Sequence, residues 1–207
     1  MRASLLDHPG ATGGPAVARA LEASGWDVLR FAPDQPLPPA ELVVLPDGFA
    51  PPGMEILPRS LAKGLRGHLE TGGHGLGLGL GFRQLCALGL LPGRWEARDM
   101  GFLHRLVTLR VEHTGLGFTR GLGADRVGPW PMATAFRGPI LEAEERLDLQ
   151  LEGRVAFRLE DPLPGEPDLD LMGLCAWEGR LLGLSALPER VPEGLEAILS
   201  GLGISKS

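Results

Sequence analysis

The sequence predicts a three-layer α/β fold, in which helices cover both faces of a mostly parallel central sheet with an antiparallel extension. Two observations predict this class. The first half alternates short apolar runs with amphipathic helical segments, and the second half contains strand-like runs that follow one another without helices. A chain of 207 residues with 43% apolar and 22% charged residues can bury the core that such a fold needs. We expect one domain over residues 1–207.

Each element of the first half follows from its hydrophobic period. Leu61, Leu65 and Leu69 recur every four residues and predict one buried stripe of a helix. The run Leu42–Leu45 is apolar on both faces, as strands inside parallel sheets usually are. The expected elements are strand 3–6, helix 16–24, strand 26–31, strand 41–46, helix 60–70, strand 76–78 and helix 82–88.

The second half predicts mainly strands. Short apolar or alternating runs separated by turn residues favour antiparallel pairing at one side of the parallel sheet. A last strand and a last helix complete the pattern. The expected strands are 106–112, 147–151, 155–159, 171–177 and 180–185, and the helix is 192–199.

The glycine-rich stretch from Leu76 to Gly81 is the candidate site around which the chain is organised. An apolar strand reaches glycines and turns at once into a helix, and in α/β enzymes such a turn commonly holds a nucleophile. The helix N-terminus at such a turn favours negative charge. The residue at the tip is Gly79, which carries no reactive atom.

Bulk properties exclude several classes of function. The net charge of −6 argues against nucleic-acid binding, and the sequence has no apolar run long enough for a membrane helix. The first residues do not resemble a signal peptide, so we expect a cytoplasmic protein. We expect no cofactor and no metal, because the histidines and two cysteines lack ligand spacing. The 19 prolines and the absence of tyrosine fit either a thermophile or a GC-rich genome.

Short segments spread over nearly the whole chain match one known family in the same order. They include the buried strand with its turn, the glycine-rich turn, and Gly-Leu-Leu-Pro-Gly followed further on by Leu-Arg-Val-Glu. The sequence there resembles class I glutamine amidotransferases, most closely the glutaminase subunit of phosphoribosylformylglycinamidine synthase. Pattern and resemblance agree on a flavodoxin-like sandwich. The matching segments are 17–22, 42–46, 48–49, 81–82, 89–93, 109–112, 118–119, 184 and 188–190.

The resemblance implies a Cys-His-Glu triad, and this chain keeps one member. The nucleophile position falls on Gly79, the base position on Leu187, and the third position on Glu189. A thiolate, a base and an orienting carboxylate are all needed for this covalent chemistry. The resemblance further assigns Asp47, Gly48 and Leu80 to the oxyanion region and Thr134 and Arg137 to the pocket. Asp47 places a carboxylate where negative charge would develop.

Neither cysteine is expected to replace the missing thiol. Cys86 lies seven residues beyond Gly79, about 10 Å along the predicted helix, and Cys175 lies inside an apolar strand. No histidine precedes Pro188. Glu189 has a second interpretation, in which its carboxylate only stabilises the start of a helical segment.

Two hypotheses of function remain open. The first is a degenerate, non-catalytic subunit whose partner is a synthetase large subunit or a second copy of the chain. The second is a small-molecule binder or enzyme that reuses the pocket of the glutamine amidotransferase site with Asp47, Thr134, Arg137 and Glu189. Asp47 and Arg137 have a further interpretation as solvated loop charges. A nucleotide-binding role for Gly77-x-Gly79-x-Gly81 is disfavoured, because the spacing is not that of the dinucleotide fingerprint.

Overall fold

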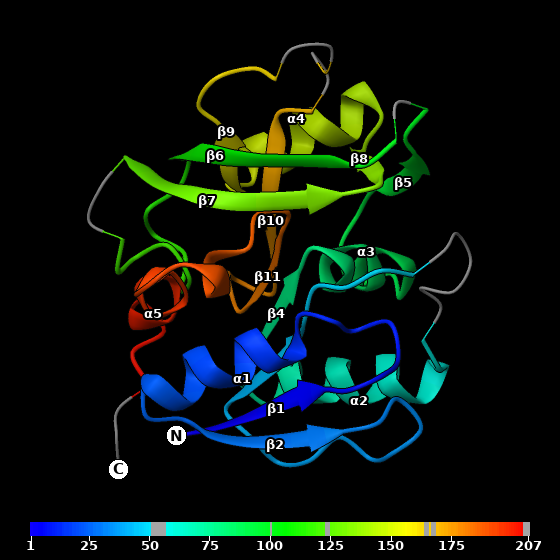
Figure 1. Cartoon of the computed structure of the whole chain (residues 1–207), viewed down its shortest axis with the longest axis vertical. Helices are drawn as coiled ribbons and strands as arrows, with labels where there is room; N and C mark the ends of the chain where they lie inside the picture. The colour runs from blue at the N-terminus through cyan, green and yellow to red at the C-terminus, as the bar shows by residue number, and fades with distance from the viewer. Residues whose placement is uncertain (51–56, 100, 123–124, 164–165, 167–168, 205–207) are drawn as a thin grey trace.

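The computed structural model describes residues 1–50, 57–99, 101–122, 125–163, 166 and 169–204. Its centre is a sheet of nine described strands that runs through the whole molecule (Figure 1). A described pair of strands, β5 (Arg94–Ala97) and β8 (Phe136–Ile140), forms a second, small sheet. The nine strands, in spatial order, are β2 (Asp27–Phe31), β1 (Arg2–Leu6), β3 (Leu42–Leu45), β4 (His74–Leu78), β11 (Leu181–Leu184), β10 (Leu171–Ala176), β9 (Val155–Leu159), β6 (Leu103–Val111) and β7 (Arg126–Thr134).

The first five strands of this order are parallel. β1 pairs with β2 and β3, and β4 pairs with β3 and β11, all in parallel register. All four residues of β3 and of β11 are buried, which is expected for strands covered on both faces. Because parallel strands share one direction, their carboxyl ends meet at one edge of the sheet, where open α/β folds place their sites.

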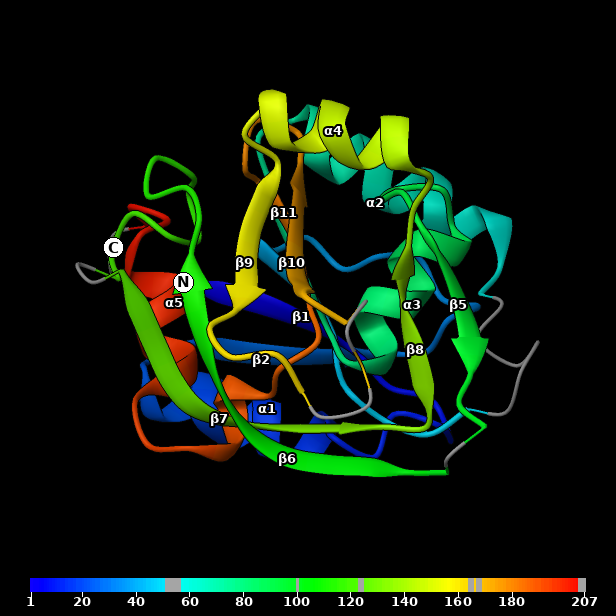
Figure 2. The same ribbon diagram turned by 90° about the horizontal axis from the view of Figure 1, so that it is seen from above.

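The remaining strands are antiparallel. β10 runs against β11 and β9, and β6 runs against β9 and β7. β6 and β7 form a long curved ribbon across one end of the molecule (Figure 2). β7 brings the chain back toward the carboxyl edge of the parallel strands, since Leu187 donates its backbone N–H to Pro131 at 2.8 Å.

Helices cover both faces of the sheet. α1 (Gly14–Ala23) and α5 (Gly194–Ser200) lie on one side, and α2 (Arg59–Glu70), α3 (Leu80–Ala87) and α4 (Ala143–Leu151) lie on the other (Figure 2). The buried residues form two clusters that correspond to these sides. Val17 and Leu195 belong to one cluster, whereas Leu65, Phe82 and Leu149 belong to the other. The predicted fold class, a three-layer α/β sandwich with an antiparallel extension, is confirmed.

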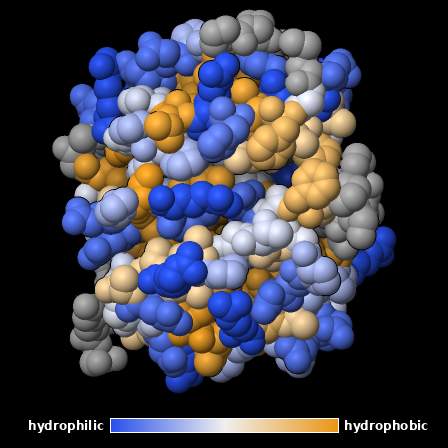
Figure 3. All heavy atoms as spheres, viewed as in Figure 1, coloured by the Kyte–Doolittle hydropathy of each residue, from blue (hydrophilic) through white to orange (hydrophobic). Residues whose placement is uncertain are grey.

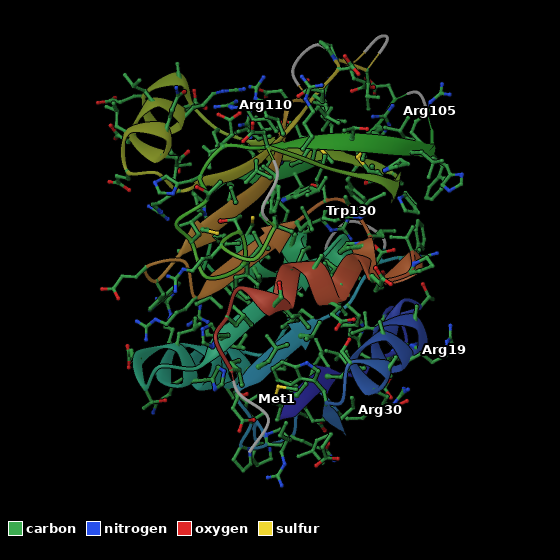
Figure 4. The ribbon with its side chains drawn as sticks, turned by 90° about the vertical axis from the view of Figure 1, so that its left-hand side faces the viewer. Met1, Arg19, Arg30, Arg105, Arg110 and Trp130 are labelled. Carbon is green, nitrogen blue, oxygen red and sulfur yellow. The ribbon has the colours of Figure 1, made fainter. Side chains whose placement is uncertain are left out.

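The ribbon of β6 and β7 has an inner and an outer face. Trp130 on β7 is buried between the ribbon and α5, whereas Arg105 and Arg110 project from the opposite side (Figure 4). Among the described residues, no helix is long and apolar enough to cross a membrane.

The expected strand 147–151 is wrong, because these residues form the second half of α4. Leu147, Leu149 and Leu151 alternate with polar residues, but only Leu149 is buried, and the other two are 55% and 76% exposed. The acidic residues Glu144 and Glu145 in the first turn favour the helix through its dipole. Strands β7 and β8 were not expected, because Pro129, Pro131 and Pro139 lie within them.

Candidate active site at the turn between β4 and α3

The glycine-rich turn has the sharp strand-to-helix geometry that the sequence predicts. β4 ends at Leu78, α3 begins at Leu80, and Gly79 between them has φ 51° and ψ −106°. This backbone conformation is rare for residues with a Cβ. The backbone N–H of Gly79 donates to Leu184 of the neighbouring strand at 2.8 Å, which anchors the turn to the sheet.

The carboxylate of Asp47 fills the space beside Gly79. Asp47 follows β3 at the same edge of the sheet, and its Oδ1 accepts the backbone N–H of Leu80 at 3.2 Å. A Cβ added to Gly79 would overlap Asp47 Oδ1. Any side chain at position 79 therefore competes with the Asp47 carboxylate for the same volume.

Arg190 links Asp47 to Glu189. The Nη2 atom of Arg190 lies 3.3 Å from Asp47 Oδ2, and its Nε lies 3.7 Å from Glu189 Oε1. The side chains of Asp47 and Glu189 are 8% and 0% exposed, whereas that of Arg190 is 41% exposed. Two carboxyl groups thus share one guanidinium group at the border of the protein interior.

Burial dominates the ionisation of both carboxyl groups. Burial raises the pKa of Glu189 to about 7, and the neighbouring Asp47 adds to this rise. Burial also raises the pKa of Asp47, against the opposing hydrogen bonds from Leu80 and Gly48 and the charge of Arg190. Neither carboxylate oxygen of Glu189 has a hydrogen-bond partner among the described residues. Glu189 is therefore about half protonated near pH 7.

Leu187 stands at the predicted base position as an apolar core residue. It is fully buried and lies immediately before the short 3-10 helix η1 (Pro188–Arg190). Glu189 lies in this turn, so its interpretation as a carboxylate at the start of a helical segment fits the local structure. The Leu187 side chain has no group that accepts a proton.

A cavity of about 380 Å³ opens beside the turn. Asp47, Gly48, Leu80 and Thr134 of the predicted site line it. Arg137 does not belong to the described lining, and its guanidinium group instead lies 3.5 Å from Glu96 in the two-stranded sheet. Arg137 therefore does not share the cavity with Asp47, and Arg190 is the cationic side chain beside Asp47.

Several aromatic side chains contribute to the wall of the cavity. Phe49, Trp95, Phe102 and Phe136 line it, and hydrophobic side chains reach the surface on the right of the view in Figure 3, near β5 and α3 of Figure 1. The ring of Phe136 lies over the guanidinium group of Arg83, 3.6 Å from ring centre to carbon. Arg83 is itself buried and donates to Ala50 O at 2.6 Å. Phe136 is thereby held in place as part of the wall.

Sequence reasoning missed Arg190 and Ser185. Arg190 pairs with a residue 143 positions earlier, and its only sequence signal was its place beside Glu189 in a matching segment. Ser185 follows β11 and lines the cavity, but a single serine after an apolar strand carries no sequence signal.

The two thiols are far from the conditions of a reactive cysteine. Burial raises the pKa values of Cys86 and Cys175 to about 12. Cys86 lies near the C-terminal end of α3, whereas the turn is at its N-terminal end. The Sγ atom of Cys86 donates to Pro92 O at 3.3 Å. No group of three or more His, Cys, Asp or Glu side chains suited to a metal ion occurs in the described part of the chain.

Comparison with solved structures assigns the class of fold. The chain superposes on a chain in the structure of PurLQS from Thermotoga maritima with a TM-score of 0.80 at 24% identity, covering 97% of this chain and 96% of that one. It also superposes on a glutamine amidotransferase from Thermotoga maritima with a TM-score of 0.57 at 16% identity, covering 91% and 76%. The fold is that of the glutamine amidotransferases.

Curated relatives narrow this class to one family. The chain is 33% identical to the phosphoribosylformylglycinamidine synthase subunit PurQ of Cereibacter sphaeroides, over 100% of this chain and 96% of the relative. It is 31% identical to the same subunit of Rubrobacter xylanophilus, over 100% and 97%. No protein-family model matches the sequence. The chain belongs to the family of phosphoribosylformylglycinamidine synthase subunit PurQ.

Proposed function

We propose that this chain is a non-catalytic member of the PurQ family, which does not hydrolyse glutamine and serves as a partner or regulatory module of a synthetase large subunit. One observation carries the proposal. The carboxylate of Asp47 occupies the space that any side chain at position 79 would need, and it is held there by the N–H of Leu80 and by Arg190.

The electrostatics of the turn also oppose amide hydrolysis. Attack on a glutamine amide places negative charge on the carbonyl oxygen, and catalysis requires hydrogen-bond donors aimed at that oxygen. At this turn the N–H of Leu80 already donates to Asp47, and the carboxylate would repel a developing oxyanion. The same residue thus removes both the room for a nucleophile and the environment for its product.

No other described group supplies the missing chemistry. The resemblance puts the base at position 187, where the leucine side chain is buried and apolar. The thiols of Cys86 and Cys175 have pKa values raised to about 12 by burial, so almost no thiolate is present at neutral pH. Glu189 alone does not form a covalent intermediate with an amide substrate in this family's mechanism.

The partner part of the proposal rests on how much of the family scaffold remains. This chain spans 96% of the Cereibacter sphaeroides relative and superposes on nearly all of a chain of the PurLQS structure. A domain kept at this length without its reactive residues still offers the surfaces by which a subunit docks. A second copy of the chain is the other candidate partner.

Glutamine hydrolysis tests the catalytic half. The purified chain is incubated with glutamine, alone and with the large subunit from the same organism, and glutamate release is followed with glutamate dehydrogenase. We expect no release above buffer, while a PurQ relative with an intact triad turns over in the same assay. Glutamate-releasing activity that copurifies with the chain, and that is lost in the Asp47→Asn or Cys86→Ser variant, refutes the proposal.

Native mass spectrometry tests the partner half. The chain is isolated gently from its source cells and its intact complexes are weighed. A stoichiometric complex with a large synthetase subunit supports the proposal. A chain that is found only alone contradicts it, and a chain found only as a homo-oligomer contradicts the large-subunit partner and supports the second copy instead.

A further inference from the structure

The cavity beside Gly79 has the size of a small-molecule site. Its volume of about 380 Å³ lies within the range of roughly 300–1,000 Å³ that is typical of ligand pockets. Its lining comes from many separate parts of the fold, among them the loop after β3, the turn before α3, strands β5 and β6, and the ends of β7, β8 and β11. A preformed cavity of this kind can select a ligand by the polar groups at its floor.

Among the polar groups of the lining, Asp47 and Ser185 have unused hydrogen-bonding capacity. Ser185 is 8% exposed, and its hydroxyl has no hydrogen-bond partner among the described residues. The Asp47 carboxylate accepts hydrogen bonds from the backbone N–H groups of Leu80 and Gly48 and from Arg190, which leaves about one of its four acceptor sites unused. The hydroxyl of Thr134 differs, because it both accepts from the N–H and donates to the carbonyl of Phe136. Asp47 and Ser185 therefore remain for a ligand.

The Asp47 carboxylate disfavours an anionic group placed directly beside it, although the guanidinium groups of Arg83 and Arg190 also belong to the lining. The N-terminus of α3 would ordinarily attract an anion, but the Asp47 carboxylate already accepts its first N–H. A second carboxylate or phosphate beside Asp47 would meet like-charge repulsion in a buried place. A ligand with an N–H group meets the opposite condition, since the carboxylate accepts a hydrogen bond from it.

The walls favour a flat apolar body. Phe49 and Phe102 are 59% and 62% exposed at the cavity, although large apolar side chains are usually covered. Phe136 is fixed by its contact with Arg83, and Trp95 completes the aromatic lining. A planar ring that enters between these side chains would stack on them and remove their surface from water.

We propose that the cavity binds an uncharged planar heterocycle or aromatic amide, whose N–H group donates to Asp47 and whose polar edge pairs with Ser185. This inference goes beyond the missing chemistry at Gly79 and rests on the proposed function, because it takes Asp47 as a fixed part of the floor. The aromatic side chains of the lining contact the faces of the ring. An amide or amino heterocycle satisfies both polar groups, whereas a carboxylate of the same shape does not.

Benzamide and benzoate provide matched probes, since they differ in one NH₂ group against one negatively charged oxygen. Their binding to the full chain, and that of adenine, is measured by saturation-transfer NMR and calorimetric titration at pH 8. We expect benzamide and adenine to bind at least about tenfold more tightly than benzoate, as one buried charge contact requires. Benzoate binding equal to or tighter than benzamide overturns the inference, as does no binding of either amide-type probe up to 10 mM, roughly the weakest range of fragment affinity.

Substitutions locate the binding. Ser185→Ala should weaken benzamide about threefold to tenfold, the usual effect of one neutral hydrogen bond. Asp47→Asn keeps an acceptor for Leu80 but removes the charge, so the preference for benzamide over benzoate should fall below about threefold. Ser200→Ala, at an exposed serine of α5 outside the cavity, is the control and should change nothing. Unchanged binding in both Ser185→Ala and Asp47→Asn contradicts the inference.

Glutamate release is measured on the same samples. Ligand binding without glutamate release supports both the inference and the proposed function. Glutamate release together with the expected preference for benzamide over benzoate refutes only the proposed function. If neither glutamate release nor that preference is seen, only the ligand-binding inference is refuted.

Discussion

Replacing the buried carboxyl group of Glu189 by an amide should change how the stability of the chain depends on pH. The Glu189 side chain is 0% exposed, and burial raises its pKa from 4.5 to about 7. The unfolded chain releases this proton near pH 4.5, whereas the folded chain holds it to about pH 7. The folded state thus binds more protons between these values, so this group makes the protein less stable as the pH rises through that window. Glu189→Gln has no proton to lose and removes this loss.

The size of the effect follows from the shift. One pKa unit corresponds to about 1.4 kcal/mol, so a rise of roughly 2.5 units corresponds to about 3 kcal/mol between pH 4 and pH 8.5. For a domain of this length, that free energy corresponds to a change in melting temperature of about 6–12 °C. The buried amide of glutamine has its own cost, but that cost is the same at every pH.

Urea unfolding of the wild type and Glu189→Gln, at half-unit steps from pH 4 to pH 8.5, measures this difference. We expect the variant to gain about 3 kcal/mol relative to the wild type across the range, with most of the gain between pH 5 and pH 7. Glu196→Gln on the exposed side of α5 is the control and should give a flat difference. A flat difference for Glu189→Gln, or a relative loss of stability at high pH, refutes the reasoning, because it shows that Arg190 stabilises the ionised carboxylate.

Three further predictions concern packing and reactivity. Gly79→Ala should lower the free energy of unfolding in urea by about 2–5 kcal/mol, because its Cβ overlaps Asp47 and the φ of this residue is 51°. In an Asp47→Gly background this loss of stability should shrink by more than about 1 kcal/mol. An unchanged loss contradicts the overlap. Gly67→Ala on α2 should stabilise the chain by about 0.5–1 kcal/mol in the same assay, since nothing lies within 4 Å of the new Cβ, and a loss of stability argues against this account. Burial raises the pKa values of Cys86 and Cys175 to about 12. Neither thiol should therefore react with an aromatic disulfide reagent at pH 8 until guanidinium chloride unfolds the chain. Rapid reaction of the native protein contradicts this prediction.

The parts of the fold that the sequence predicts are those with a strong local period. Leu61, Leu65 and Leu69 predict α2, and all three are buried in the structure. The alternation of Leu147, Leu149 and Leu151 failed, because a period of two over five residues also occurs by chance on a short amphipathic helix. Which of these leucines is buried depends on the neighbours of α4, and the local sequence does not contain that information.

In the candidate site, too, the sequence predicts the local features but not the contacts between distant residues. The turn at Gly79 is a local feature of backbone and glycine spacing, so the sequence predicts its place. The contact of Asp47 with Leu80 joins residues 33 positions apart, and that of Asp47 with Arg190 joins residues 143 apart. Such contacts depend on the crossing order of the strands. The sequence left open whether Asp47 and Arg137 share a polar pocket or are solvated loop charges, and in the structure Arg190 is the cationic neighbour of Asp47.

The overlap between Asp47 and a Cβ at position 79 also makes the residues that one position tolerates depend on the residue at the other. With Asp47 in this rotamer, a Cβ at position 79 overlaps its carboxylate, so a substitution at position 79 requires the Asp47 side chain to move. A smaller residue at position 47 removes this overlap. The effects of substitutions at the two positions should therefore not be additive, and a residue tolerated at position 79 beside one neighbour can be rejected beside another.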